Sequence, residues 1–320
     1  MDLHLLLDNL TNPALLFFFL GIIAVQLKSD LEIPANSSKF ISLYLLFSIG
    51  FKGGQELAHS ELNLEILWSL LFGIFLALLV PLYTFFILKK KFSIENAGAI
   101  AAAYGSVSAV TFVTAVSFLE IEHITFGGHM VAVMALMEAP SIIIGVLLMS
   151  VFAKSYKKGI KMGKIVHHAL TNGSVLLILG SLVIGFLTSD AQARGIAPFT
   201  TDIFKGFLAV FLLDMGITSG KKLSTFLRKG GFATIFSIVA PIINGCAVAV
   251  ASGLITDSIG NRFLFSILAA SASYIAVPAA MRLAAPKANP SLYIPMALAI
   301  TFPFNITLGM PIYLFIIQLT

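Results

Sequence analysis

Long apolar runs separated by short polar breaks dominate this sequence. Ten runs approach or exceed the roughly 20 residues that a membrane-spanning helix needs. They lie at 12–28, 38–54, 65–88, 94–118, 128–153, 170–188, 203–220, 231–254, 260–284 and 290–318. Each run predicts a helix, because lipid cannot satisfy an open backbone and the runs lack the alternation of a barrel. The sequence therefore predicts an all-α integral membrane protein with ten transmembrane helices.

Composition excludes most soluble classes of protein. Of the 320 residues, 58% are hydrophobic and only 11% are charged, whereas soluble domains carry about 25% charged residues. The net charge is +5, but the basic residues are scattered over short loops, so we expect no nucleic-acid binding. Cys246 is the single cysteine, which excludes an intrachain disulfide. The first residues lack the basic start of a cleavable signal, so we expect them to be retained.

The basic residues predict the orientation of the chain. If the loop at 154–168 is cytoplasmic, the inner loops hold 16 of the 20 Lys and Arg residues. Cytoplasmic loops of membrane proteins carry such an excess of Lys and Arg. We therefore expect a multi-pass protein with both termini outside.

The two halves of the chain resemble each other weakly but in order, 40–154 against 203–318. Three matched pairs keep a near-constant offset: Gly50 with Gly216, Gly54 with Gly220, and Glu138 with Thr301. Five helices in each half would place the second half upside down, which predicts an inverted repeat divided as 1–160 and 161–320. This architecture is typical of secondary transporters with a site at the bilayer midplane. We interpret Gly50, Gly53 and Gly54 as packing residues rather than ligands.

Small and hydroxyl residues gather in the middle of the fourth and ninth runs. The segments are Tyr104-Gly105-Ser106-Val107-Ser108-Ala109 and Ser271-Ala272-Ser273-Tyr274-Ile275-Ala276-Val277-Pro278. Gly105 and Pro278 weaken a helix at these points. A broken helix exposes N–H groups that suit a small anion and carbonyl groups that suit sodium. We predict that two broken, crossing helices form the site; the alternative is that small residues only allow close helix packing.

Two carboxylates lie inside predicted spans, Glu138 and Asp214. A charge at the bilayer centre costs about 2.5–3.5 kcal/mol on insertion scales, so such residues usually face a partner or a pathway. Glu138, close to Pro140, is a candidate cation ligand or proton-sensitive group, or else a buried carboxyl that holds helices together. Asp214 either binds a cation or pairs with Lys221 or Lys222.

Further oxygen donors lie within the spans: Thr111, Asn244, Thr301, Asn305 and Thr307. Sodium prefers such neutral oxygens with at most one carboxylate, by analogy with other hard cations. Each of them alone also fits an interhelical hydrogen bond. All six histidines fall in loops or at span ends, so no embedded base serves Ser106 or Ser108, and we expect no enzyme.

Taken together, these segments resemble the SbtA-type sodium-dependent bicarbonate transporters. The segments that carry the resemblance are Ser48-Ile49-Gly50-x-x-Gly53-Gly54, Tyr104 to Thr111, Met137-Glu138-Ala139-Pro140, Met215-Gly216, Ala240 to Gly245, and Ala288 to Ile294. The similarity spans nearly the whole chain. It implies a ten-helix inverted repeat, usually trimeric, in which a core domain moves against a gate domain during sodium-coupled bicarbonate uptake.

The resemblance also assigns residues. By position, it implies anion contacts at Gly105, Ser106, Ser108, Ser271 and Ser273. It implies sodium contacts at Glu138, Thr111 and the backbone of the ninth run, where Tyr274 stands in place of the family's aspartate. Asp214 and Thr301 complete our candidate sodium ligands.

Three functions remain open at this point. The first is a sodium-coupled symporter of bicarbonate or a similar small anion. The second is a proton-coupled transporter or exchanger of the same fold, with Glu138 carrying the proton. The third is a non-transporting sensor or scaffold in the lipid bilayer, whose basic inner face binds a PII-like regulator.

Overall fold

The computed structural model describes residues 9–60, 63–153, 163, 167, 171–227 and 231–320, and all the regular structure in this part is helical. In the first half the helices are α2 (Pro13–Gln26), α3 (Ala35–Ala58), α4 (Leu64–Leu88), α5 (Ile94–Gly105), α6 (Ala109–Ile121) and α7 (His129–Phe152). In the second half they are α9 (Gly173–Leu187), α10 (Asp190–Ala197), α11 (Phe204–Leu227), α12 (Gly231–Ala251), α13 (Ile259–Ala270), α14 (Ala276–Ala284), α15 (Pro290–Pro295), α16 (Phe302–Phe304) and α17 (Met310–Leu319). The all-α prediction is confirmed.

Short irregular helical turns extend several of these helices. π-helical turns at Met296–Thr301 and Asn305–Gly309 join α15, α16 and α17 into one continuous run. Another π-helical turn, Pro198–Asp202, follows α10, and a 3₁₀ turn, Ser252–Leu254, follows α12.

Six helical stretches in the described residues are long and apolar enough to cross a membrane. They are Leu64–Leu88, Ile94–Ile121, His129–Phe152, Asp190–Leu223, Gly231–Leu254 and Pro290–Leu319. Three shorter apolar helices are Pro13–Gln26, Gly173–Leu187 and Ile259–Ala270. α3 has 24 residues but includes Lys39, Lys52 and Glu56. The protein is thus an all-helical, multi-pass membrane protein, while the count of ten spans and the inverted repeat stay predictions.

The predicted orientation rests in part on residues that the structure does not describe. Within the predicted cytoplasmic loop, only residues 163 and 167 are described. The lysines of that loop, from Lys154 to Lys164, lie outside the described residues, as do Arg228 and Lys229. The placement of both termini outside therefore stays a prediction.

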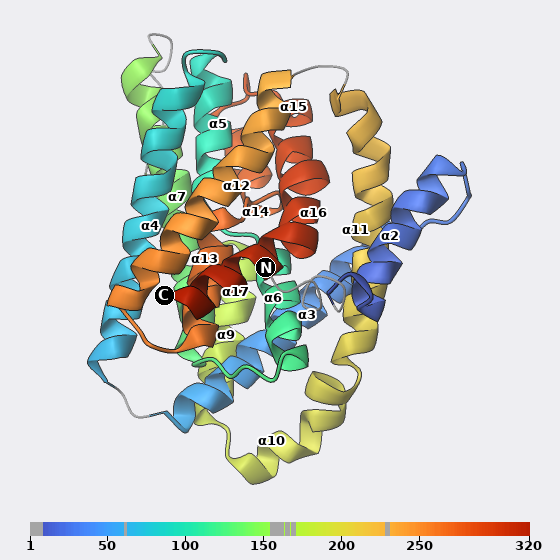
Figure 1. Ribbon diagram of the computed structural model, residues 1–320, viewed down its shortest axis with the longest axis vertical. Helices are drawn as coiled ribbons and strands as arrows, with labels where there is room; N and C mark the ends of the chain where they lie inside the picture. Colours follow the sequence, from blue (N-terminus) through green and yellow to red (C-terminus); the bar gives the residue numbers. More distant parts are fainter. Residues whose placement is uncertain (1–8, 61–62, 154–162, 164–166, 168–170, 228–230) are drawn as a thin grey trace.

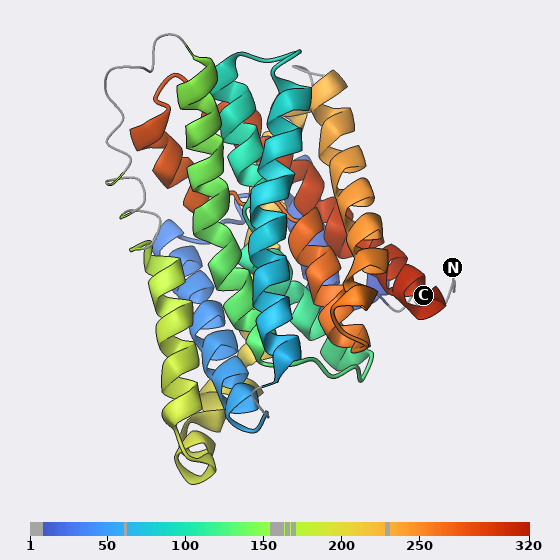
Figure 2. The same cartoon turned by 90° about the vertical axis from the view of Figure 1, so that its left-hand side faces the viewer.

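Two pairs of helices stand at the periphery of the molecule. α2 packs along α11, and α3 packs along α9. Figure 1 shows the first pair at the right of the view, and Figure 2 shows the second pair along one edge. The remaining long helices form a central group around α5, α6 and α13. Of the Ile94–Ile121 stretch, 89% of the most apolar window is buried, against 28–67% in the other five, so the broken fourth run is the most deeply buried of these six stretches.

Glycines bring the backbones of both peripheral pairs into contact. A Cβ atom at Gly216 would lie 2.0 Å from the carbonyl oxygen of Phe18 in α2. A Cβ atom at Gly54 would lie 2.1 Å from the carbonyl oxygen of Leu182 in α9, and Gly50 approaches α9 in the same way. Small residues allow such close approach of membrane helices. Our interpretation of Gly50 and Gly54 as packing residues is confirmed.

Candidate functional site at two helix breaks

The first break separates α5 from α6 at residues 106–108. Gly105 ends α5 against Pro81 of α4, where a Cβ atom would lie only 2.4 Å from Pro81 Cδ. Ser106 then leaves the helix in an extended conformation, with φ −80° and ψ 161°. Ser108 caps α6, because its Oγ accepts a hydrogen bond from the Thr111 N–H at 3.2 Å. Close packing and a serine cap thus fix a break of three residues.

The second break separates α13 from α14 at residues 271–275. Ser271 leaves α13 with φ −80° and ψ 166°, almost the conformation of Ser106. α14 then begins at Ala276 without a side-chain cap. Pro278 lies in its first turn and contributes no N–H group. The second break is therefore longer and leaves the N-terminal end of its following helix uncapped.

The two breaks contact each other. The Ser108 N–H donates to Ser271 Oγ at 3.0 Å, and the Ser273 N–H donates to the Ala103 carbonyl oxygen at 2.8 Å. Ser108 and Ser273 are each the third residue after their helix ends; Ser108 bonds to the opposite break, and Ser273 bonds to the last turn of α5 just before the opposite break. The extended segments therefore meet in the buried centre of the protein, as the sequence predicted.

Two asparagines from other helices cap the C-terminal end of α13. Asn244 Nδ2 donates to the Ala269 carbonyl oxygen at 3.1 Å, and Asn305 Nδ2 donates to the Ala270 carbonyl oxygen at 2.9 Å. The Tyr313 hydroxyl donates to Asn305 Oδ1 at 3.1 Å. Because these amides bind the last two carbonyl oxygens of α13, the C-terminal end of this helix is stabilised by the protein itself and needs no ligand. The sequence left two roles open for both asparagines, an oxygen ligand and an interhelical hydrogen bond, and the structure shows the hydrogen bond in both cases.

Three side-chain oxygens near the first break are buried without a hydrogen-bond partner. They are Ser106 Oγ, Thr111 Oγ1 and Glu138 Oε1, on the first break, α6 and α7 respectively. Their residues are only 0%, 1% and 7% exposed. Buried polar side-chain atoms usually have a partner. Hard oxygens such as these are suitable ligands for a small cation.

A cavity of about 20 Å³ lies between the two breaks and the neighbouring helices. Its polar lining comes from Ser108, Ser174, Ser273, Tyr274 and Glu138. This volume holds a single water molecule or a small cation. The structure thus brings Glu138, Tyr274 and serines of both breaks to one space. Their roles as ligands stay predictions.

Two predicted residues lie away from this cavity and have other partners. Asp214 Oδ2 on α11 accepts a hydrogen bond from Ser38 Oγ of α3 at 2.5 Å. Thr301 Oγ1 donates to the Ser237 carbonyl oxygen at 2.7 Å and lies 2.7 Å from the Tyr104 hydroxyl. Neither residue lines the small cavity. Their roles as sodium ligands stay predictions.

An all-helical membrane protein in which two interrupted helices meet at a buried polar cavity has an arrangement typical of secondary transporters. A comparison with protein families identifies the particular class. Residues 13–318 match the Na⁺-dependent bicarbonate transporter superfamily, so the chain belongs to this family. No curated protein matched the chain. The family membership confirms the resemblance found in the sequence and places the protein among membrane transporters.

Proposed function

We propose that the protein carries bicarbonate, or a similar small anion, into the cell together with sodium, by alternating access at the crossing of the two helix breaks. Family membership supports the substrate and the coupling ion. The observation that carries the proposed site is that three buried oxygens, on Ser106, Thr111 and Glu138, lack a partner and that one of these residues, Glu138, lines an ion-sized cavity.

Of the two ions in this proposal, sodium is the one that fits these three oxygens. Glu138 supplies one negative charge, and the hydroxyl groups of Ser106 and Thr111 supply neutral oxygens. Tyr274 lines the cavity and offers a further hydroxyl. One carboxylate with several neutral oxygens is a set that a hard monovalent cation prefers. Sodium bound here would give these oxygens the partners that they lack in the protein.

The anion would bind beside the cation. α6 and α14 both begin at the breaks, so the positive ends of their dipoles face the crossing. The hydroxyl groups of Ser106, Ser108 and Ser273 are available as donors at the same place. Gly105 and Ser271 shape the site, through the contact with Pro81 and the bond to the Ser108 N–H. Sodium binding first would add positive charge and favour the anion.

The small cavity is too small to hold both ions. Its volume of about 20 Å³ suits one ion. Leu46 of α3 and Ser174 of α9 form part of its wall, and these two helices are one of the peripheral pairs. Binding of the anion therefore requires the breaks and the α3–α9 pair to separate. A relative movement of this kind is what alternating access demands.

Matching caps support the proposed inverted repeat. Ser93 Oγ accepts from the Asn96 N–H at 3.3 Å at the start of α5, and Ser258 Oγ accepts from the Asn261 N–H at 3.3 Å at the start of α13. Both helices have 12 residues and both end at an extended serine. Equivalent residues in the two helices are 165 positions apart, close to the offset in the sequence.

The same two asparagines make equivalent contacts with the opposite half. Asn96 Oδ1 accepts from the Asn289 N–H at 2.8 Å, just before α15. Asn261 Oδ1 accepts from the Gly127 N–H at 2.7 Å, just before α7. Each half thus supports a loop of the other half through an equivalent side chain, which is the relation that a twofold repeat produces.

Proton coupling at Glu138 is the second candidate. A buried carboxyl oxygen without a partner also fits a neutral, protonated side chain. In that case Glu138 would carry the proton, and sodium would not be needed.

The wider organisation follows from the resemblance. We propose two five-helix halves, 1–160 and 161–320, in a homotrimer of the bacterial inner membrane with both termini outside. A PII-like regulator would bind the basic inner face.

Uptake of labelled bicarbonate into proteoliposomes tests the proposal. We expect an inward sodium gradient to drive uptake, and we expect Glu138→Gln and Ser106→Ala to reduce it strongly. Glu32→Gln, at an exposed position in the described part of the chain, is the matched control. Uptake driven by a proton gradient without sodium would favour the second candidate. The absence of flux with any ion gradient would favour a sensor or scaffold.

A further inference from the structure

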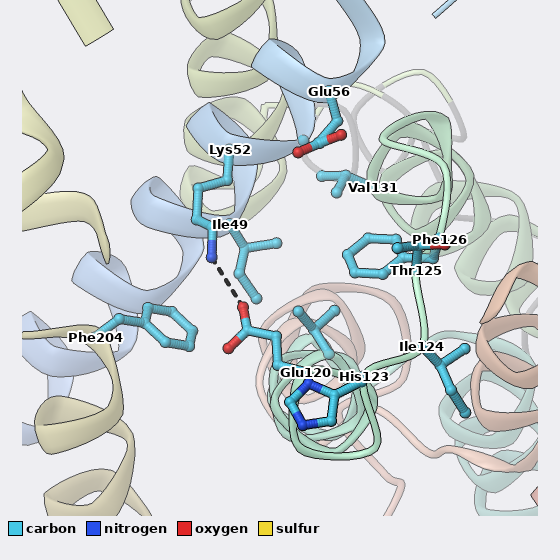
Figure 3. A pocket seen from close by; sticks show the side chains of 12 residues that line it. Ile49, Lys52, Glu56, Glu120, His123, Ile124, Thr125, Phe126, Val131 and Phe204 are labelled. Carbon is cyan, nitrogen blue, oxygen red and sulfur yellow. Dashed lines mark hydrogen bonds and ion pairs between the residues drawn. The ribbon is translucent and has the colours of Figure 1, made fainter. Parts of the chain in front are cut away.

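A second, larger cavity of about 400 Å³ lies at the other end of α6 (Figure 3). Its walls come from α3, α6, α7, α11 and the loop between α6 and α7. Its polar side chains are Lys52, Glu56, Glu120, His123 and Thr125. Figure 3 shows Lys52 and Glu120 pointing toward each other at this cavity, with Phe204 beside them.

The large cavity and the small cavity lie along the same boundary between helices. α6 lines the small cavity at Ser108 and the large one at Val116 and Glu120. α3 also lines both, at Leu46 and then at Lys52. Ser108 and Val116 are eight residues apart, which is about 12 Å along a helix. An ion that moves from the large cavity to the helix breaks therefore has about 12 Å to cover along the boundary between α3 and α6.

One carboxylate joins α6 to both peripheral pairs. Glu120 Oε1 lies 2.9 Å from Lys52 Nζ of α3, and Glu120 Oε2 lies 3.8 Å from Lys205 Nζ of α11. Lys52 Nζ also lies 5.8 Å from the centre of the Phe204 ring. These side chains are 28–62% exposed, and ion pairs of this kind are weak. They can therefore break and form again during a transport cycle.

We propose that the large cavity is the outer antechamber of the transport path, and that Lys52 alternates there between Glu120 and the incoming anion. The inference rests on the proposed function and on the predicted orientation, which places this end of α6 outside. While Lys52 is paired with Glu120, α3 stays against α6 and the breaks are closed. When the pair opens, the Lys52 ammonium group faces the antechamber and binds the small oxyanion. Glu120 therefore competes with the substrate for one positive charge.

Competition predicts opposite effects of neutralising the two partners. We expect Lys52→Gln to raise the half-saturating bicarbonate concentration about threefold, the size typical of an exposed ion pair. Glu120→Gln frees Lys52 and should lower that concentration by a similar factor. Both measurements use proteoliposomes at a fixed, saturating sodium concentration. Equal effects in the same direction would show that the pair is only structural and would overturn the proposal.

Cross-linking tests whether α3 and α6 separate. Cysteines at positions 52 and 120, in a Cys246→Ser background, would be joined by a short bifunctional thiosulfonate reagent. We expect uptake to fall at least about tenfold, as for a blocked conformational step, and to return after reduction. The matched control joins positions 55 and 188, because Gln55 Nε2 donates to the Thr188 carbonyl oxygen at 2.8 Å beside α9, within one peripheral pair. This control cross-link should leave uptake unchanged.

The outcomes separate this inference from the proposed function. Full uptake with a complete 52–120 cross-link, verified by mass spectrometry, would overturn the antechamber. If the variant with cysteines at positions 52 and 120 is inactive before cross-linking, the opposite shifts expected for Lys52→Gln and Glu120→Gln still test the proposed competition. Wild-type protein without sodium-dependent uptake would instead reject the proposed function itself.

Discussion

The break between α5 and α6 and the break between α13 and α14 differ in how their polar groups are partnered. At the second break, Asn244 and Asn305 bind the last carbonyls of α13. Ser271 Oγ accepts from the Ser108 N–H and donates to the Leu268 carbonyl oxygen at 2.9 Å. At the first break, the equivalent hydroxyl of Ser106 is buried and has no partner. Two serines with nearly the same backbone conformation thus have opposite hydrogen-bonding states.

This difference assigns the two breaks to different tasks. A buried polar group without a partner costs about 1–3 kcal/mol, so the first break is under-satisfied until a ligand binds. Sodium at this break would offset that cost and stabilise the folded protein. At the second break, the last carbonyl groups of α13 and the Ser271 hydroxyl already have partners, and these bonds hold the first break in place. We therefore expect substitutions at the first break to affect binding and those at the second to affect stability.

The largest effect on binding is expected for Glu138→Gln. The amide keeps the shape of the side chain but removes the only charge among the three unpartnered oxygens. We expect the sodium concentration that gives half-maximal thermal stabilisation to rise at least about 100-fold, since even outer partners of metal ligands are worth 10- to 100-fold. The melting temperature without sodium should stay near that of wild type. Unchanged sodium stabilisation would remove Glu138 from the site.

The next effect is a loss of stability at the second break. Asn305→Ala leaves the Ala270 carbonyl oxygen without its amide partner and removes one acceptor of the Tyr313 hydroxyl. We expect a loss of about 1–3 kcal/mol, measured as a lower melting temperature in detergent without sodium. Thr307→Val in the same helical run is the control, because its hydroxyl bonds within its own helix. A stable Asn305→Ala protein with weakened sodium binding would contradict our division of tasks.

Ser106 and Ser271 offer the most direct comparison, because they occupy equivalent positions in the two breaks. Ser106→Ala removes a hydroxyl without a partner, so we expect sodium or anion affinity to fall about tenfold, as for loss of a hydrogen bond to a charged group. Ser271→Ala removes the acceptor of the Ser108 N–H and should cost about 1 kcal/mol of stability. Titration by thermal shift measures both quantities in one experiment. The same response in both variants would mean that the breaks are functionally alike.

The location of both breaks was predictable from the sequence because it depends on local chemistry. Gly105, the serines after each helix end, and Pro278 all weaken or cap helices within a few residues. The predicted fourth and ninth runs do contain the breaks, and α5 ends at Gly105 itself. Local signals of this type are independent of how the chain packs elsewhere.

The partners of the polar residues were not predictable in the same way. Asn305 and Ala270 are 35 residues apart in the chain, and Tyr104 and Thr301 are 197 apart. Without the packing of the helices, a hydroxyl or amide within a span suits a ligand role and a structural role equally. The pairing of Lys52 with Glu120 was missed for the same reason, because the two residues are 68 positions apart.

The smallest expected effects separate Thr111 from Thr301, which the sequence placed in one set of candidate ligands. Thr111 Oγ1 has no partner, whereas Thr301 Oγ1 donates to the Ser237 carbonyl oxygen. We expect Thr111→Val to weaken sodium binding about threefold, a modest factor because only one neutral oxygen is lost while the Glu138 carboxylate stays. Thr301→Val should instead lower the melting temperature, by about 1 kcal/mol of stability, with unchanged sodium affinity. If Thr301→Val weakens sodium binding at constant stability, sodium binds at the second half as well. The first break would then no longer be the sole site of the cation.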